Sequence, residues 1–151
     1  MGFKVIVEST DAKFSASHFL KEPLQCTRLH GHNYYVHVEV GDDLDKNHFV
    51  VDFTDLKDNL MTIIKPMDHY VLIPTESNEL NIREEKDSIE IIASNKRYVF
   101  PREDVFFLPL PATTSELLAK YIHDKLKEIY TNKKILVRVG ESKSTMAVFE
   151  E

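Results

Sequence analysis

The sequence predicts an α+β fold in which an antiparallel sheet is covered on one face by two helices. Segments that alternate apolar and polar residues, as strands do, lie toward both ends of the chain. Two segments with apolar residues at helical spacing lie further in. Strands and helices do not alternate regularly, as they would in a parallel α/β sheet. The second sheet face must then be solvated or buried against another subunit.

Three strands are predicted in the first part of the chain, at 3–8, 13–19 and about 31–40. In the second strand, bulky or apolar residues alternate with small polar ones, which places Phe14 and His18 on one face.

A first helix is predicted after the third strand, because apolar residues recur there at helical spacing. Either Asp52 or Thr54 can cap its first turn, and Pro66 ends it. The apolar stripe is assigned to the core and consists of Phe53, Leu56, Leu60 and Ile63.

A second helix is predicted from a capping box, Thr113 followed by Glu116. Two strands follow it, at 135–139 and 146–149. The stripe that would pack this helix against the sheet consists of Leu118, Ile122, Leu126 and Ile129.

The chain of 151 residues is expected to form a single domain, 1–151, because two domains would each be small. Between the helices lies an inserted segment of about 78–105, in which 89–93 and 97–100 are predicted to form a hairpin.

The composition, 42% hydrophobic and 29% charged, is that of an ordinary soluble globular protein. A net charge of -6 argues against general nucleic-acid binding, which depends on clustered Lys and Arg. No apolar run approaches the roughly 18 residues of a membrane span, and no signal peptide is evident. A lone cysteine fits a reducing compartment, so a cytoplasmic location is expected.

Potential chemistry is concentrated at Cys26, His30 and His32. Side chains alternate along a strand, so His30 and His32 fall on the same side. Pairing with the strand that carries His18 would bring three imidazoles together. Three nitrogen ligands without a fourth protein ligand are typical of catalytic zinc, although copper, nickel and iron also accept imidazole. The alternative is that these are ordinary strand histidines.

The other histidines are weaker candidates. His37 lies five residues after His32 and would face the opposite side of an uninterrupted strand. His48 is predicted in a polar turn, and His123 within the second helix.

Cys26 is either a base or nucleophile, acting as the thiolate, or a small buried residue. Asp68-His69 pairs a carboxylate with an imidazole that can relay protons. Neighbouring residues in a strand point apart, so a direct bond between Asp68 and His69 requires a turn at this position. The alternative is that Asp68 only caps the segment that follows Pro66. Glu141 and Glu116 can each be explained by structure alone, as a solvated turn residue and as part of the capping box.

Taken together, these residues resemble the 6-pyruvoyltetrahydropterin and 6-carboxytetrahydropterin synthase family, which has the tunnelling fold. The resemblance covers most of the chain, with the motifs in the same order. They are Phe14-Ser-Ala-Ser-His18, Cys26 with His30-Gly31-His32-Asn33-Tyr34, Val51-Asp-Phe with Asp55-Leu-Lys, Asp68-His69, Thr114-Ser115-Glu116-Leu-Leu-Ala119, and Glu141 followed by Ala147.

The resemblance implies three groups of site residues. A zinc ion would be bound by His18, His30 and His32. Protons would be transferred by Cys26, Asp68 and His69. The pterin ring would be bound by Glu141, whose carboxylate can accept two parallel hydrogen bonds, with Thr114, Ser115 and Glu116 near the start of the second helix.

The family acts on 7,8-dihydroneopterin triphosphate. One branch forms the pyruvoyl product by eliminating triphosphate, and the other also cleaves the side chain, releases acetaldehyde and forms 6-carboxy-5,6,7,8-tetrahydropterin for queuosine and archaeosine precursors. The three-residue gap between Cys26 and His30 resembles the carboxy-forming branch. A related branch uses glutamate in place of or beside the cysteine, and Glu22 is nearby, but Cys26 occupies the expected place.

A third possibility is a zinc-stabilised module that binds a pterin or purine without converting it. By the same resemblance, the antiparallel sheets of three copies would close into a β-barrel around a tunnel, and two trimers would pair into a homohexamer. Such an assembly would cover the second sheet face and remove its exposed edges.

Overall fold

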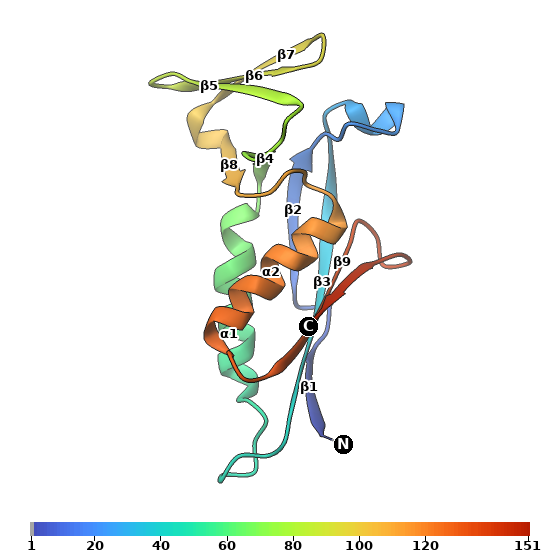
Figure 1. Cartoon of the computed structure of the whole chain (residues 1–151), viewed down its shortest axis with the longest axis vertical. Coiled ribbons are helices and arrows are strands. Elements are labelled where there is room, and N and C mark those ends of the chain that lie inside the picture. The colour runs from blue at the N-terminus through green and yellow to red at the C-terminus, as the bar shows by residue number, and fades with distance from the viewer. Residues whose placement is uncertain (1) are drawn as a thin grey trace. The chain divides into compact units, whose positions relative to one another are not determined.

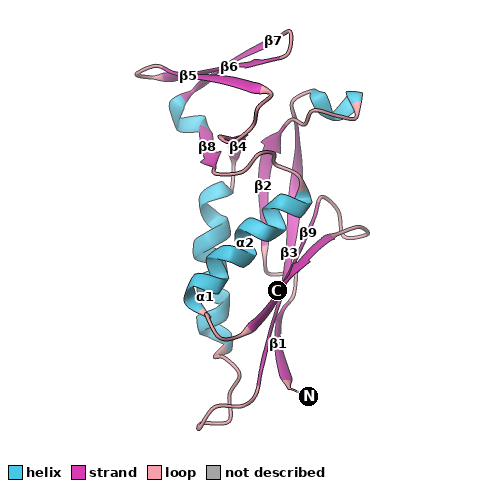
Figure 2. Cartoon of the chain, viewed as in Figure 1, coloured by secondary structure: helices cyan, strands magenta, loops and turns pink. Residues whose placement is uncertain are grey.

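The computed structural model describes residues 2–151, which form two helices and ten strands (Figures 1 and 2). The chain divides into two compact units built from separated stretches. The first unit contains the stretch ending at Phe14, Asn33–Pro66 and Ser115–Glu151. The second contains Ser15–His32 and Met67–Thr114.

The sheet of the first unit is antiparallel throughout, in the order β10-β9-β3-β1. Its strands are β1 (Phe3–Val7), β3 (His30–Asp42, from Asn33 onward in this unit), β9 (Lys134–Gly140) and β10 (Ala147–Glu150). The predicted strands at both ends of the chain are therefore confirmed, with ends that differ by one or two residues.

Two helices belong to the first unit, α1 (Phe53–Ile64) and α2 (Ser115–Ile129). Helix α2 packs on β9 and β10, and α1 packs on α2 and β1. Asp52 caps α1 by accepting a hydrogen bond from the amide of Asp55, as predicted. A 3-10 turn, Lys65–Met67, follows α1.

The core of the first unit lies between these helices and the sheet. Each fully buried Val or Leu contributes about 1.5–3 kcal/mol relative to an exposed one, so this layer supplies much of the stability. Its members include Val36, Val38, Val40, Leu60, Leu118, Ile122 and Val137.

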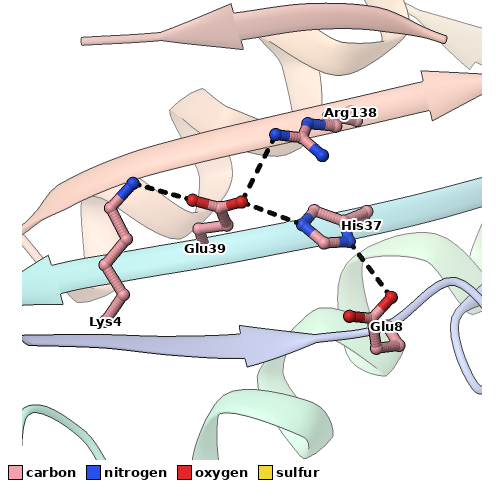
Figure 3. Close-up of polar contacts among 5 residues, drawn as sticks. All are labelled: Lys4, Glu8, His37, Glu39 and Arg138. Atoms are coloured by element: carbon pink, nitrogen blue, oxygen red, sulfur yellow. Dashed lines mark hydrogen bonds and ion pairs between the residues drawn. The ribbon is translucent and has the colours of Figure 1, made fainter.

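The alternate residues of β3 carry charge and polarity instead (Figure 3). Glu39 accepts a hydrogen bond from Lys4 at 2.9 Å and lies 3.4 Å from Arg138. His37 lies between Glu39, at 3.1 Å, and Glu8, at 3.5 Å. Because β3 runs without interruption from His30, His37 is on the opposite side of the strand from His32, as predicted.

The second unit contains a parallel arrangement that the sequence analysis did not predict. Strand β2 (Lys13–His18) pairs in parallel with β4 (Tyr70–Pro74), which pairs in parallel with β8 (Val105–Leu108). The predicted α+β class is confirmed, but these two pairings are parallel where an antiparallel sheet was predicted. Strands β4 and β8 are short apolar runs, and the sequence predicts no strand at either position.

A separate three-stranded antiparallel sheet fills the inserted segment of the second unit. Its strands are β5 (Leu80–Glu84), β6 (Ser88–Ala93) and β7 (Lys96–Pro101), followed by a 3-10 turn, Arg102–Asp104. The β6–β7 hairpin confirms the prediction, whereas β5 was missed. The buried hydrophobic cluster of the second unit comprises Phe19, Ile73, Ile89 and Ile91.

Candidate metal centre and active site

Three imidazoles meet in the second unit. His18 ends β2, and His30 and His32 belong to the first three residues of β3. Their rings meet at steep angles, with centroids 4.7, 5.2 and 4.9 Å apart. One ligand nitrogen from each lies within 4.8 Å of the others, so small side-chain movements allow one ion to bind all three. The geometric expectation from the His-x-His spacing is confirmed.

Gly31 separates the two histidines of β3 and lets the backbones approach closely. A Cβ at this position would lie only 3.2 Å from the carbonyl oxygen of Ala16 in β2. With a larger residue here, the backbone at Ala16 would have to shift by a few tenths of an ångström.

Backbone carbonyls orient two of the three rings. His18 Nδ1 lies 2.9 Å from the Thr113 carbonyl oxygen and 3.2 Å from Thr113 Oγ1, and His30 Nδ1 lies 2.6 Å from the Arg28 carbonyl oxygen. A carbonyl only accepts hydrogen bonds, so each Nδ1 must carry the proton. The neutral ring then has its lone pair on Nε2, which is the arrangement of a metal ligand.

Burial reinforces this state at His18, whose side chain is fully enclosed. Burial is the main cause that lowers the pKa of His18 from 6.5 to about 4, and the neighbouring His30 and His32 act in the same direction. The hydrogen bond to the Thr113 backbone opposes this shift. His18 is therefore neutral near pH 7, as a metal ligand must be.

The donor set fits a borderline metal ion such as zinc. Three imidazole nitrogens form the set, with second bonds that fix two of the rings. Three protein ligands leave a coordination position for water or substrate, as in catalytic zinc sites.

Cys26 lies in the same unit, half-buried in the 3-10 turn Leu24–Thr27. Its amide donates to the Pro23 carbonyl at 2.8 Å, and its carbonyl accepts from the Leu20 amide at 2.8 Å. The backbone of the cysteine is therefore held on both sides. Glu22, the nearby carboxylate, is exposed.

Asp68 and His69 are in direct contact, and both lie in a turn. His69 Nδ1 lies 2.9 Å from Asp68 Oδ2. The backbone of His69 adopts φ 67°, a left-handed conformation that ordinary residues rarely take. Ser15 fixes both residues, since its amide donates to Asp68 Oδ1 at 2.8 Å and its carbonyl accepts from the His69 amide at 2.6 Å. The imidazole itself is 81% exposed and accessible to a substrate.

The predicted pterin-binding residues lie in both units. Thr114 ends the second unit, while Ser115 and the exposed Glu116 form the first turn of α2 in the first unit. Because α2 begins at Ser115, Thr113 is one residue too early to be the helix cap, and the predicted capping box is wrong. Thr113 is buried beside His18 instead.

Glu141 follows β9 in the first unit and is exposed. Its loop folds back on Gly140, where a Cβ would collide with the carbonyl oxygens of Thr145 and Ser142. Only glycine fits there. The pKa of Tyr34 is raised mainly by burial and further by the charge of Glu141, which places that carboxylate near the buried tyrosine.

The sequence analysis missed three orienting groups: Thr113, Ser15 and the Arg28 carbonyl. Thr113 and Ser15 are 95 and 53 residues from the side chains that they contact. Two of the contacts use backbone atoms alone, which carry no signal in the sequence. Only Thr113 makes part of its contact through a side chain, and the sequence predicts that residue as a helix cap.

A family model described as 6-pyruvoyl tetrahydropterin synthase matches residues 8–151. The 6-carboxy-5,6,7,8-tetrahydropterin synthase of Haemophilus influenzae is 30% identical over 149 residues, 95% of this chain and 97% of that protein. The Aquifex aeolicus protein of the same name is 37% identical over 105 residues, 69% of this chain and 58% of that protein.

Solved structures agree with these matches. The 6-pyruvoyl tetrahydropterin synthase of Plasmodium falciparum has a TM-score of 0.91 at 29% identity, covering 99% of this chain and 98% of that chain. The Plasmodium vivax synthase gives the same score and identity over 100% of this chain and 98% of that chain. Variants of the P. vivax protein in which a catalytic glutamate is replaced match equally well. Neither helix of residues 2–151 has the length and apolar character needed to cross a membrane.

Proposed function

The chain belongs to the 6-pyruvoyl tetrahydropterin synthase family, and on that premise we propose that it is a zinc-dependent lyase that forms 6-carboxy-5,6,7,8-tetrahydropterin from 7,8-dihydroneopterin triphosphate. The observation that carries the proposal is the trio of His18, His30 and His32, with donor atoms within 4.8 Å. The curated relatives named for the carboxy product support the choice of reaction.

Zinc bound by these histidines would supply a Lewis acid for oxygen atoms of the substrate side chain. The protein's part is to aim the ligand nitrogens at one point. Thr113 and Arg28 do this through their carbonyl oxygens, which hold Nδ1 of His18 and His30.

Cys26 is proposed as the base that takes a proton from the substrate side chain. A thiolate is the reactive form of cysteine, and its turn keeps the backbone fixed while the side chain stays partly accessible. His69 would return a proton, with Asp68 holding its Nδ1 and stabilising the charged ring. In the P. vivax synthase a glutamate is a catalytic residue.

Glu141 is proposed to bind the pterin ring through its amino and ring N–H groups, because a carboxylate can accept both in parallel. Thr114, Ser115 and Glu116 would contribute further contacts near the start of α2. In a closed trimer, Glu141 would serve the metal site of a neighbouring copy. Assembly as a trimer or a pair of trimers, a cytoplasmic location and a place in queuosine precursor synthesis belong to the same proposal.

A second reaction is favoured by the solved structures, which are 6-pyruvoyl tetrahydropterin synthases at 29% identity. That reaction eliminates triphosphate and leaves the side-chain carbons in place. The spacing from Cys26 to His30 and the names of the curated relatives favour the carboxy product instead.

The deciding experiment is to incubate the zinc-loaded protein with 7,8-dihydroneopterin triphosphate and measure acetaldehyde and the pterin product. We expect acetaldehyde and 6-carboxy-5,6,7,8-tetrahydropterin in equal amounts. Triphosphate release without acetaldehyde would establish the pyruvoyl reaction. Binding of the pterin with no product would show a passive module.

The role of Cys26 is tested by Cys26→Ala, which should keep zinc and fold but lose turnover, since no other cysteine exists in the chain. Glu22→Gln is the matched control and should retain activity. Normal product formation by Cys26→Ala would remove the thiol from the mechanism.

A further inference from the structure

The inserted three-stranded sheet contacts both ends of the segment that carries Cys26. At one end, Tyr98 of β7 stacks on Phe19, with ring centroids 4.8 Å apart and an interplanar angle of 15°. At the other end, Lys96 Nζ donates to the Thr27 carbonyl at 2.9 Å and to Thr27 Oγ1 at 3.2 Å. All of these residues belong to the second unit.

The geometry of β7 explains how one strand reaches both ends. Side chains alternate along the strand, and Lys96, Tyr98 and Phe100 share the partly buried face. Arg97 points the other way and is exposed, paired with Glu90. The tight connection from β6 makes the start of β7 well defined, and a left-handed Ser94, at φ 59°, allows that turn.

The Cys26 segment needs such outside support. No residue of the turn Leu24–Thr27 is buried, and Leu24 is 77% exposed. Hydrogen bonds hold the turn, among them the two at the Cys26 backbone and one from Thr27 Oγ1 to the Leu24 carbonyl, at 2.7 Å. A turn without apolar packing is held mainly by hydrogen bonds, which water can replace.

The donors and acceptors at Thr27 are mutually consistent. The Thr27 hydroxyl donates its hydrogen to Leu24 and accepts from the Lys96 ammonium. A lysine normally extends its charged end into water, whereas Lys96 directs it at a backbone oxygen one residue after Cys26. Hydrogen bonds from a charged donor are shorter and stronger than neutral ones.

We propose that Lys96 is a positioning residue: together with Tyr98, it fixes the Cys26 segment so that the thiol is held in place for proton transfer. The inference rests on the proposed function of Cys26 as base. It gives the insertion a role in the active site, since β7 supplies contacts that the segment cannot make by itself.

The first test compares Lys96→Met with Lys96→Arg and Arg97→Met in the full-length, zinc-loaded protein. Misplacing a reacting group by about 1 Å costs up to about 100-fold in rate, so Lys96→Met should lower kcat by about 10-fold or more. KM and zinc content should stay near the wild-type values. Lys96→Arg should restore most of the rate, because a guanidinium can also donate to the Thr27 oxygens. Arg97→Met, the neighbour on the other face of β7, should behave like wild type.

The second test does not depend on catalysis. Hydrogen exchange at the amides of Leu20 and Cys26 reports whether the segment is held closed, because both donate to carbonyls within it. Exchange should be faster in Lys96→Met than in wild type and unchanged in Arg97→Met. If exchange is faster in Lys96→Met but the protein forms no pterin product, the proposed function is refuted and the positioning role of Lys96 is supported. Unchanged exchange in Lys96→Met, or a kcat equal to that of Arg97→Met, would overturn the inference.

Discussion

Strand β3 presents histidines on both of its sides, and their partners differ in kind. On one side, His30 joins His18 and His32 in a group that could bind a metal ion, and His30 Nδ1 lies 2.6 Å from a backbone carbonyl oxygen. On the other side, His37 lies between the carboxylates of Glu8 and Glu39. The same residue type in one strand therefore has two chemical environments.

The difference shows how a protein selects ligand histidines. A carbonyl oxygen occupies one nitrogen of the ring and fixes the proton there, which leaves the lone pair of the other for a metal. Two carboxylates, one at each nitrogen, engage the whole ring, and His37 then serves the charged network of Figure 3 rather than a metal. His69 is intermediate, with one carboxylate at Nδ1 and an exposed ring for proton transfer.

The largest effect expected is from removing a carbonyl-held ligand. His30→Ala should lose zinc and turnover together, with metal affinity reduced by more than the roughly 100-fold that outer partners account for. His37→Ala is the matched variant from the other side of β3 and should keep its zinc. Elemental analysis of both purified variants tests the contrast, and a full complement of zinc in His30→Ala would contradict it.

Asp68→Asn tests the intermediate case. The amide oxygen can still accept from the Ser15 amide, but the carboxylate charge beside His69 Nδ1 is lost. Acid–base groups contribute about 100- to 10,000-fold, so kcat should fall by about 100-fold while zinc is retained. Steady-state rates beside metal content measure this. A rate within twofold of wild type would exclude the pair from proton transfer.

Thr113→Val probes the second bond of a ligand. It removes Oγ1, at 3.2 Å from His18 Nδ1, but keeps the carbonyl at 2.9 Å. Zinc affinity should therefore fall only several-fold, up to about 10-fold. Thr62→Val removes a hydroxyl that bonds only within α1, to the Asp58 carbonyl, and is the control. Competition with a chromophoric chelator compares them, and equal affinities would show that the hydroxyl has no part in the site.

The smallest effect concerns the charged side of β3. The pKa of Glu39 is lowered, first by the hydrogen bond from Lys4 and then by that from His37. A lowered carboxyl pKa stabilises the fold above the ordinary value of 4.5, and this stability is lost as the pH falls through the folded-state pKa.

Lys4→Met removes the first of these bonds. The free energy of unfolding at pH 7 should fall by at most about 1 kcal/mol, because Lys4 is well exposed. The further loss on acidification should be smaller than in wild type. Denaturant titrations at pH 7 and below pH 4.5 measure both. The same acid dependence in both proteins would show that Lys4 does not shift Glu39.

Periodicity located much of this architecture, because alternation reports directly which side of a strand a residue faces. Phe14, His18, His30 and His32 were placed correctly on that basis. Strands β4 and β8 were missed because runs of four or five apolar residues do not distinguish strand from irregular core. Their parallel pairing depends on distant partners. The orienting contacts of Thr113 and Ser15 were hidden for the same reason.

The contact between His18 and Thr113 also bears on synthesis. Thr113 lies 95 residues after His18, so a nascent chain leaving the ribosome cannot complete this contact until most of the protein has been made. Domains fold as units once their segments are available. The orientation of His18 by the Thr113 carbonyl is therefore complete only after residue 113 has emerged.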